Sequence, residues 1–293
     1  MRIVSLLPSA TEILFAIGAG DDVVGVTHEC DFPVDALALP KLTSSAIDAR
    51  GAPGDIDRHV RRNVHAGSSL YHLDAELLAR LAPDLIVTQE LCAVCAVSYD
   101  TVDRAVKRLH GDARVVSLEP SSLEDVFATI GVVGDLTARP AEARALVSRL
   151  RNAFTELRAA TQARPRRPRA LLLEWTDPPM SAGHWIPELV EIAGATPVLA
   201  DAGRDSRRLS WEEISVADPD AIVVAPCGFD IRKTNRAIEE LDTVDTWRSL
   251  RAVRDGRVYA MDGNAYVSRP GPRLFESAEL MATALGAPDA SRR

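Results

Sequence analysis

The feature that most constrains the fold is an alternation of short apolar runs with helical patterns along nearly the whole chain. The runs "RIVSLL", "DVVGVT", "DLIVT" and "RALLLEW" have the length of buried strands, and segments with helical spacing lie between such runs. Strands that alternate with helices in this way are typical of α/β units, in which the strands pair in parallel. The sequence therefore predicts an α/β fold with mostly parallel sheets.

The same pattern occurs twice along the chain. "LAPDLIVTQ" in the first half and "VADPDAIVVAP" in the second share the order of helix end, proline turn and strand. Between these halves, a helix is predicted from Pro140 to about Ala160, which at about 1.5 Å per residue would be roughly 30 Å long. We expect an N-terminal α/β lobe at residues 1–120, a backbone helix and linker at 121–168, and a C-terminal α/β lobe at 169–293.

The start of the chain contains one strand–helix unit of this pattern. "RIVSLL" predicts the first strand and "SATEILFAIGAG" predicts the helix that follows it. Ser9 is suited to the N-cap of this helix, and Glu12, three residues later, would complete a capping box. Pro8 then falls in the loop after the strand, where α/β proteins place ligand-binding residues.

Charge and hydropathy exclude several classes of function. The formal net charge is −8, whereas a protein that binds nucleic acid normally presents a basic face. The one basic cluster, "RPRRPR" at residues 164–169, is interpreted as a linker, because arginine is interspersed with proline. No apolar stretch reaches the roughly 20 residues needed to cross a bilayer. We therefore expect no nucleic acid partner and no membrane-embedded segment.

The expected location follows from the first residues and from the cysteines. "MRIVSLLPSATEILF" contains a proline and a glutamate and is not typical of an export signal. Four cysteines without such a signal suggest reduced thiols. We expect a cytoplasmic protein, or a periplasmic or otherwise extracytoplasmic one if a signal has been removed.

All four cysteines fall just after predicted strands. Cys30 follows "DVVGVT", Cys92 and Cys95 follow "DLIVT" as a CxxC pair, and Cys227 follows "AIVVAP". Ligands of parallel α/β sheets bind outside the carboxyl ends of the strands, so we expect partly exposed and reactive thiols there. The alternative for each cysteine is a small buried apolar residue, which is the usual role of a free cysteine.

The same loops could hold a metal ion. Imidazole and thiolate are suitable ligands for zinc or iron, and His28 lies two residues before Cys30. With Cys92 and Cys95 these residues would complete a set of four ligands. The two halves of this set lie far apart in the sequence, so their spacing alone does not define a known metal motif.

Aromatic and acidic side chains near the predicted strand ends suggest a large ring ligand. Trp175, Trp185 and Tyr266 offer flat apolar faces with a polar edge, although either tryptophan could instead close the core of its lobe. Glu174 follows an apolar run, where a carboxylate needs a hydrogen-bond partner or water. The residues expected to contact a ligand are Pro8, His28, Glu29, Glu90, Cys92, Cys95, Glu174, Trp175, His184, Trp185, Cys227, Asn264 and Tyr266.

The chain resembles the class III substrate-binding proteins of ABC importers, most closely the cobalamin-binding branch. The resemblance lies in "RIVSLLPSATEILFAIGAGDDVVGVTHECDFP", "LAPDLIVTQ", the long central helix, "AGHWIPELVEIAGA" and "GRVYAMDGNAY". It implies two Rossmann-like lobes joined by a long rigid backbone helix, with a corrinoid (cobalamin or a precursor) held between them without turnover. It also implies an ABC importer permease as partner. Ser268 and Arg269 stand where the cobalamin receptors show an acidic residue.

Two other functions remain open from the sequence. One is a cytoplasmic enzyme on the same scaffold, with Glu174, His28 or His184 as acid–base groups and the cysteines as metal ligands or nucleophile. The other is a carrier of a metal ion, haem or a siderophore. The sequence contains no nucleophile elbow, phosphate-binding loop or dinucleotide-binding glycine pattern.

Overall fold

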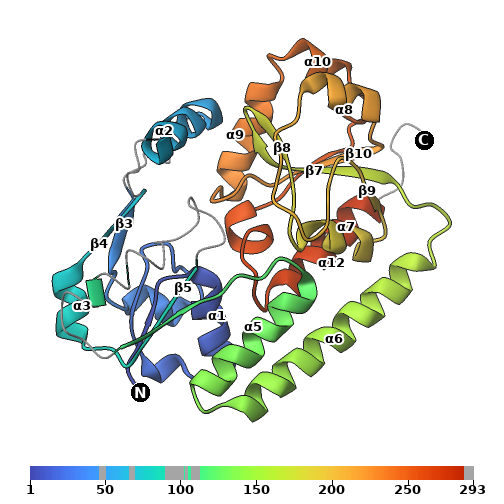
Figure 1. Ribbon diagram of the computed structural model, residues 1–293. Helices are drawn as coiled ribbons and strands as arrows, with labels where there is room; N and C mark the ends of the chain where they lie inside the picture. Colours follow the sequence, from blue (N-terminus) through green and yellow to red (C-terminus); the bar gives the residue numbers. More distant parts are fainter. Residues whose placement is uncertain (46–50, 66–69, 90–101, 103–104, 107–112, 287–293) are drawn as a thin grey trace. The chain divides into compact units, whose positions relative to one another are not determined.

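The structure is a computed structural model that describes residues 1–45, 51–65, 70–89, 102, 105–106 and 113–286. It divides into two compact units. Unit 1 comprises residues 1–51, 58–120 and 124–149, and unit 2 comprises residues 52–57, 121–123 and 150–293. Each unit contains a mainly parallel sheet with helices (Figure 1), so the expected α/β class is confirmed.

In the part of unit 1 that is described, the main sheet has four parallel strands in the order β2-β1-β5-β6. Ile3 of β1 pairs with Val23 of β2 on one side and with Leu85 of β5 on the other. The central strands are apolar because they are buried on both faces. The strands of unit 1 are β1 (Ile3–Ser5), β2 (Val23–Val26), β5 (Leu85–Thr88) and β6 (Arg114–Ser117), with an antiparallel pair β3 (Thr43–Ser45) and β4 (Tyr71–Leu73).

The sheet of unit 2 has the order β11-β10-β7-β8, with β9 pairing β7. Strands β7, β10, β11 and β9 pair in parallel, and β8 returns antiparallel to β7. All four residues of β10 are fully buried. The strands of unit 2 are β7 (Arg169–Thr176), β8 (Pro179–Ser181), β9 (Thr196–Pro197), β10 (Ala221–Val224) and β11 (Val258–Ala260).

Helices alternate with the strands along the chain. Those mainly in unit 1 are α1 (Pro8–Ala16), η1 (Gly20–Asp22), η2 (Val34–Ala38), α2 (Pro53–His65), α3 (Ala75–Leu81) and α5 (Leu123–Leu136). Those in unit 2 are α7 (Ile186–Ile192), α8 (Trp211–Ala217), α9 (Ile231–Leu241), α10 (Asp245–Ser249), α11 (Arg251–Arg254), η3 (Gly263–Val267) and α12 (Leu274–Gly286).

The predicted central helix is present as α6 (Pro140–Gln162), which is one continuous helix in Figure 1. Leu146 and Phe154 are buried, as the helical spacing of apolar residues predicts. The Phe154 ring packs edge to face on Phe275 of α12, with 5.5 Å between the ring centroids. Although α6 is long, charged residues occur throughout it, and no helix within the described residues is long and apolar enough to cross a membrane.

The repeated sequence pattern has a repeated structural role. Asp84 precedes β5, and its Oδ2 accepts the backbone N–H of Arg2 at 2.7 Å, just before β1. Asp220 precedes β10, and its Oδ2 accepts the backbone N–H of Arg169 at 2.9 Å, at the start of β7. In each unit, one carboxylate therefore fixes the start of the neighbouring parallel strand.

The expected capping box of the first helix is wrong. Helix α1 begins at Pro8, and its N-cap is Leu7, two residues earlier than the expected Ser9 and without a side-chain hydrogen bond. Proline is favoured in the first helical turn because its φ is already helical and it has no N–H to leave unsatisfied. Ser9 and Glu12 are consequently helical residues and are buried.

Candidate functional site

The carboxyl edge of the unit 2 sheet brings together aromatic side chains from two neighbouring strands. Strand β7 extends through Thr176, so Glu174 and Trp175 are among the last residues of the strand and do not lie in the loop after it. The Trp175 ring packs edge to face on Phe229, which follows β10, with 5.2 Å between the centroids. The backbone N–H of Cys227 also donates to the Glu174 carbonyl at 3.1 Å. The strand end and the loop after β10 are thus held against each other.

The helix η3 follows β11 and completes this edge. Gly263 begins η3 where a β-carbon would collide with the carbonyl oxygens of Ala225 and Pro226, so only glycine allows this close approach. The N–H of Asn264 donates to the Phe229 carbonyl at 3.1 Å. These contacts place η3 directly beside the loop that carries Phe229.

Positively charged side chains lie against the aromatic groups of this edge. The Arg273 guanidinium lies 5.6 Å from the centroid of the Tyr266 ring, and Lys233 Nζ lies 5.9 Å from that of Phe229. Arg269, only 5% exposed, donates to Asn264 Oδ1 at 3.0 Å. The edge therefore combines aromatic faces with hydrogen-bond donors, which is a chemistry suited to a large ring with polar substituents.

Trp185 and His184 lie close together, but the tryptophan serves the interior of unit 2. Trp185 is 5% exposed, and its indole N–H donates to the carbonyl of Val267 at 3.1 Å. This geometry matches the alternative in which the tryptophan closes the core. The same hydrogen bond ties η3 to Trp185. The His184 ring lies 5.6 Å from that of Trp185, and its Nε2 is 3.3 Å from the exposed carboxylate of Asp205.

In unit 1, Cys30 follows β2 as expected but is buried, with 1% of its surface exposed. Its Sγ lies 3.0 Å from Thr11 Oγ1, which donates to Ser5 Oγ at 2.8 Å. Lys41 Nζ donates to the Cys30 carbonyl at 2.8 Å and so fixes the loop with the thiol turned inward. The expectation of an exposed thiol is therefore wrong for Cys30, whereas Cys227 is exposed as expected.

His28 is held by a chain of hydroxyl groups in unit 1. Its Nδ1 lies 2.7 Å from Thr43 Oγ1, which lies 2.8 Å from Thr27 Oγ1. Its Nε2 is 3.6 Å from the carboxylate of Glu29. Burial lowers the pKa of the His28 imidazole below its usual value, Glu29 opposes this shift, and Lys41 adds to it. The neutral imidazole is therefore favoured.

The metal site expected from the sequence has His28, Cys30, Cys92 and Cys95 as its four ligands. Cys92 and Cys95, like the predicted ligand residue Glu90, lie outside the described residues. Across the residues that are described, no group of three or more histidine, cysteine, aspartate or glutamate side chains converges as a metal site would require. Cys30 contacts the Thr11 hydroxyl instead. Pro8, at the carboxyl end of β1, is buried at the start of α1.

Three side chains of the unit 2 edge were missed in the sequence, namely Phe229, Lys233 and Arg273. Phe229 lies in "CGFD", directly after a predicted strand, so the strand-end rule could have found it. Lys233 and Arg273 carried no such signal, because they lie on or just before helices rather than directly after strands.

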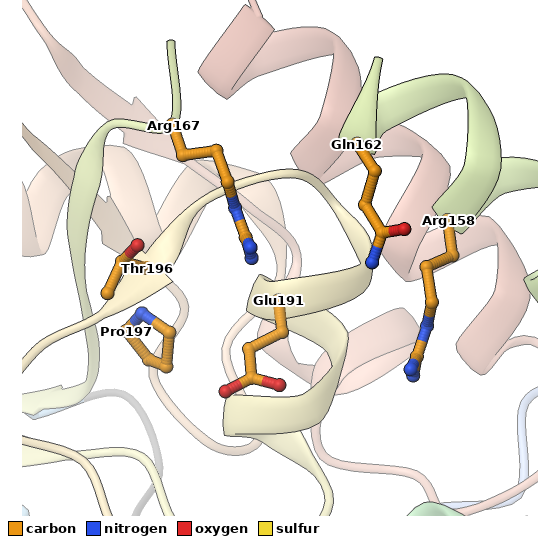
Figure 2. Close-up of a pocket in the computed structure, with 6 residues that line it drawn as sticks. All are labelled: Arg158, Gln162, Arg167, Glu191, Thr196 and Pro197. Carbon is orange, nitrogen blue, oxygen red and sulfur yellow. The ribbon is translucent and has the colours of Figure 1, made fainter. Parts of the chain in front are cut away.

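A separate pocket of about 210 Å³ lies elsewhere in unit 2, between α6, α7 and the start of β9. Figure 2 shows Arg158 and Gln162 projecting from α6 and Glu191 projecting from α7 among the residues that line it. Arg167 also lines it, and its guanidinium donates to the Ala195 carbonyl at 3.0 Å. Strand β9 pairs with the first residues of β7, so this pocket is at the amino end of the sheet. None of the sequence-predicted ligand residues lines it.

A family model described as "Periplasmic binding protein" matches residues 3–265. The chain belongs to this family. It is therefore a substrate-binding protein of the periplasmic binding fold, as the resemblance in the sequence indicated.

Curated relatives match this chain along nearly its whole length. A vitamin B12-binding protein of Vibrio cholerae is 24% identical over 97% of this chain and 88% of the relative. A substrate-binding lipoprotein of an ABC transporter, YvrC of Bacillus subtilis, is 27% identical over 97% of this chain and 79% of the relative. A cobalamin-binding protein of Halobacterium salinarum is also 27% identical, over 97% of this chain and 69% of the relative.

Solved structures share the fold. A possible iron-binding protein of Staphylococcus epidermidis superposes with a TM-score of 0.75 at 23% identity and covers 98% of each chain. The periplasmic haem-binding protein RhuT of Roseiflexus superposes with a TM-score of 0.72 at 23% identity, covering 97% of each chain. The comparisons give no support to the expectation of a cytoplasmic protein.

Proposed function

We propose that the protein binds a metal-centred tetrapyrrole without chemical turnover, with a corrinoid (cobalamin or a precursor) as the first candidate. The observation that carries this proposal is the carboxyl edge of unit 2, where the end of β7, the loop after β10 and η3 carry Trp175, Phe229 and Tyr266, with cationic groups against two of the rings. A tetrapyrrole is a wide ring with polar substituents. It can place its apolar face on such aromatic groups and its rim on the donors.

The corrinoid is preferred because curated relatives that match over 97% of this chain are named for vitamin B12 or cobalamin. Haem is the second candidate, because haem-binding proteins are among the structural neighbours. The ligand residues proposed in unit 2 are Glu174, Trp175, Cys227, Asn264 and Tyr266. In unit 1, His28 and Glu29 are proposed as polar contacts.

An ABC importer permease is the proposed macromolecular partner. This part of the proposal is supported by family membership and by the printed name of the Bacillus subtilis relative, an ABC transporter substrate-binding lipoprotein. Delivery to an importer requires a place on the extracytoplasmic side of the membrane. Fractionation of cells of the source organism, with an antibody against the protein, would test this location.

Absorbance titration and calorimetry test the ligand proposal directly. The purified protein is titrated with aquacobalamin, dicyanocobinamide and hemin, and binding should saturate with a shifted visible spectrum for at least one of them. Chromatography of the released ligand should recover it unchanged, whereas a modified ligand would favour the enzyme alternative. Absence of heat and of spectral change with all three compounds would reject the proposed function.

A further inference from the structure

We propose that the pocket between α6, α7 and the start of β9 is a second binding site, which takes a small amino acid with two carboxylates, such as glutamate or aspartate. The pocket has a volume of about 210 Å³ (Figure 2) and lies at the amino end of the unit 2 sheet. The edge proposed for the tetrapyrrole is at the carboxyl end of the same sheet. The residues that line the pocket are Arg158, Gln162, Arg167, Glu191, Thr196 and Pro197.

The walls of this pocket are fixed by contacts between elements of unit 2. The Thr161 hydroxyl donates to the Ile192 carbonyl at 2.7 Å and joins the end of α6 to the end of α7. Gly194 follows α7 with a φ of 88°, and a β-carbon there would lie 2.8 Å from Thr161 Cβ. Arg164 Nη1 donates to the Ala282 carbonyl of α12 at 2.9 Å. The hollow beside these contacts is therefore present before a ligand binds, so ordering the site costs little free energy.

Two guanidinium groups line the pocket from different segments. Arg158 belongs to α6, and among the described residues no hydrogen bond or ion pair engages its side chain. Arg167 belongs to the basic segment before β7, and its Nη2 donates to the Ala195 carbonyl at 3.0 Å. This bond holds the Arg167 guanidinium in place and leaves further N–H donors on it. Because a guanidinium matches the geometry of a carboxylate, each arginine can take one carboxylate of a ligand.

Glu191 determines which kind of anion the pocket accepts. It lies on α7, and in the part of the chain that the structure describes no ion pair joins it to Arg158 or Arg167. Its carboxylate repels a simple anion and attracts an ammonium group. Gln162 and Thr196 add an amide and a hydroxyl, each of which can donate or accept a hydrogen bond. Two cationic groups and one anionic group thus match the two carboxylates and the one ammonium of an acidic amino acid.

Matched ligands test this complementarity group by group. The full chain is titrated with L-glutamate and L-aspartate, with glutarate and succinate, which lack the ammonium group, and with glutamine and asparagine, which lack one carboxylate. Proton–nitrogen NMR spectra of the arginine side chains and backbone amides report binding. At least one acidic amino acid should saturate the site, and its two analogues should bind about fivefold more weakly, because one charge pair at an exposed site is lost.

Three results of this titration would overturn the proposal. They are absence of saturation by both acidic amino acids, equal affinity for an acidic amino acid and its analogue without ammonium, and equal affinity for inorganic phosphate. The last two would make the pocket a site for simple anions, in which Glu191 takes no part.

Variants then assign the contacts. Glu191→Gln should weaken binding of the amino acid about fivefold, since its ammonium loses a partner, and should strengthen binding of glutarate or succinate, which are no longer repelled. Arg158→Gln should weaken binding of both kinds of ligand. Arg149→Gln and Glu156→Gln are the matched controls, because they remove the same charges from exposed positions on α6 that do not line the pocket. Weaker binding of both kinds of ligand with Glu191→Gln, or equal effects of the controls, would overturn the assignment.

The pocket and the tetrapyrrole edge should be occupied independently. Strand β7 has eight residues, so its two ends lie roughly 23 Å apart. The titration with the acidic amino acid should therefore be unchanged when the protein is saturated with hemin or aquacobalamin. Competition between the two ligands would place the amino acid at the carboxyl edge and overturn the second site. Failure of every tetrapyrrole to bind would instead reject the proposed function and leave the amino acid site intact.

Discussion

The carboxyl edges of the two sheets follow the same strand-end rule but carry different chemistry. In unit 1, the loop after β2 turns Cys30 inward onto Thr11 and holds His28 on a chain of threonine hydroxyls. In unit 2, Trp175 lies against Phe229 and an exposed thiol lies nearby. The topology thus sets where loops gather, whereas the local packing of each loop decides which side chains a ligand can reach.

At the amino ends of the two sheets, in contrast, the two units share the same local structure. The helix before each repeated strand ends on a left-handed residue, Ala82 with φ of 42° and Asp218 with φ of 39°. An aspartate then fixes the neighbouring strand in both units. In unit 2, this aspartate, Asp220, also accepts hydrogen bonds from Arg251 at 2.9 Å and Arg166 at 3.1 Å. The repeat therefore preserves a structural device while the binding edges diverge.

The largest expected difference between the units is in thiol reactivity. Cys227 is exposed, whereas Cys30 reacts only when unit 1 opens locally, so Cys227 should be alkylated at least about 100-fold faster under native conditions. Alkylation followed by peptide mass spectrometry measures both sites in one sample, and labelling in denaturant gives the reference rates. Similar native rates would contradict the buried position of Cys30. The same experiment tests the prediction that Cys92 and Cys95 react in the free protein and are shielded by ligand.

The second difference concerns the strand-fixing aspartates. Asp220→Ala should lower the free energy of unfolding by about 3 kcal/mol, since a mostly buried carboxylate with several charged donors is lost. Asp84→Ala, the matched variant in unit 1, should cost about 1 kcal/mol, because Asp84 is exposed. Urea denaturation measures both. Equal losses would show that the arginines around Asp220 contribute nothing beyond the shared backbone hydrogen bond.

The third difference concerns ligand affinity. Trp175→Ala should weaken binding of the tetrapyrrole about tenfold, because it removes an aromatic face at the unit 2 edge. His28→Ala should weaken it less, since a single neutral polar contact is worth about 1 kcal/mol. Trp211→Ala is the control, because Trp211 packs on Trp247 at 5.9 Å in the core and should affect stability rather than binding. A larger loss with His28→Ala would move the main ligand contact to unit 1.

The sequence could predict the features that depend on interactions between residues close together in the chain. Alternating apolar runs predicted the α/β class, and helical spacing predicted α6, because both depend on periodicity within one element. The capping box failed because Pro8, adjacent in sequence, competes for the first turn of α1. The strand-end rule placed Cys30 and Cys227 correctly along the chain but could not give the direction of either thiol. For Cys30, the direction of the thiol depends on Lys41 and Thr11, which are distant from it in sequence.

The smallest expected effect is the pH dependence that His28 gives to unit 1. Because burial lowers the pKa of its imidazole in the folded protein, the unfolded chain binds more protons between that lowered pKa and the usual value near 6.5. Stability should therefore fall as the pH falls from about 7 through this window, and His28→Gln should remove part of this dependence while retaining a polar contact for Thr43. Urea denaturation of both proteins at several pH values between about 5 and 8 measures the difference. The groups facing His28 are Glu29, which favours the charged form, and Lys41, which opposes it. A wild-type protein that loses no more stability than His28→Gln on acidification would show that burial does not lower the pKa of the imidazole in the folded protein.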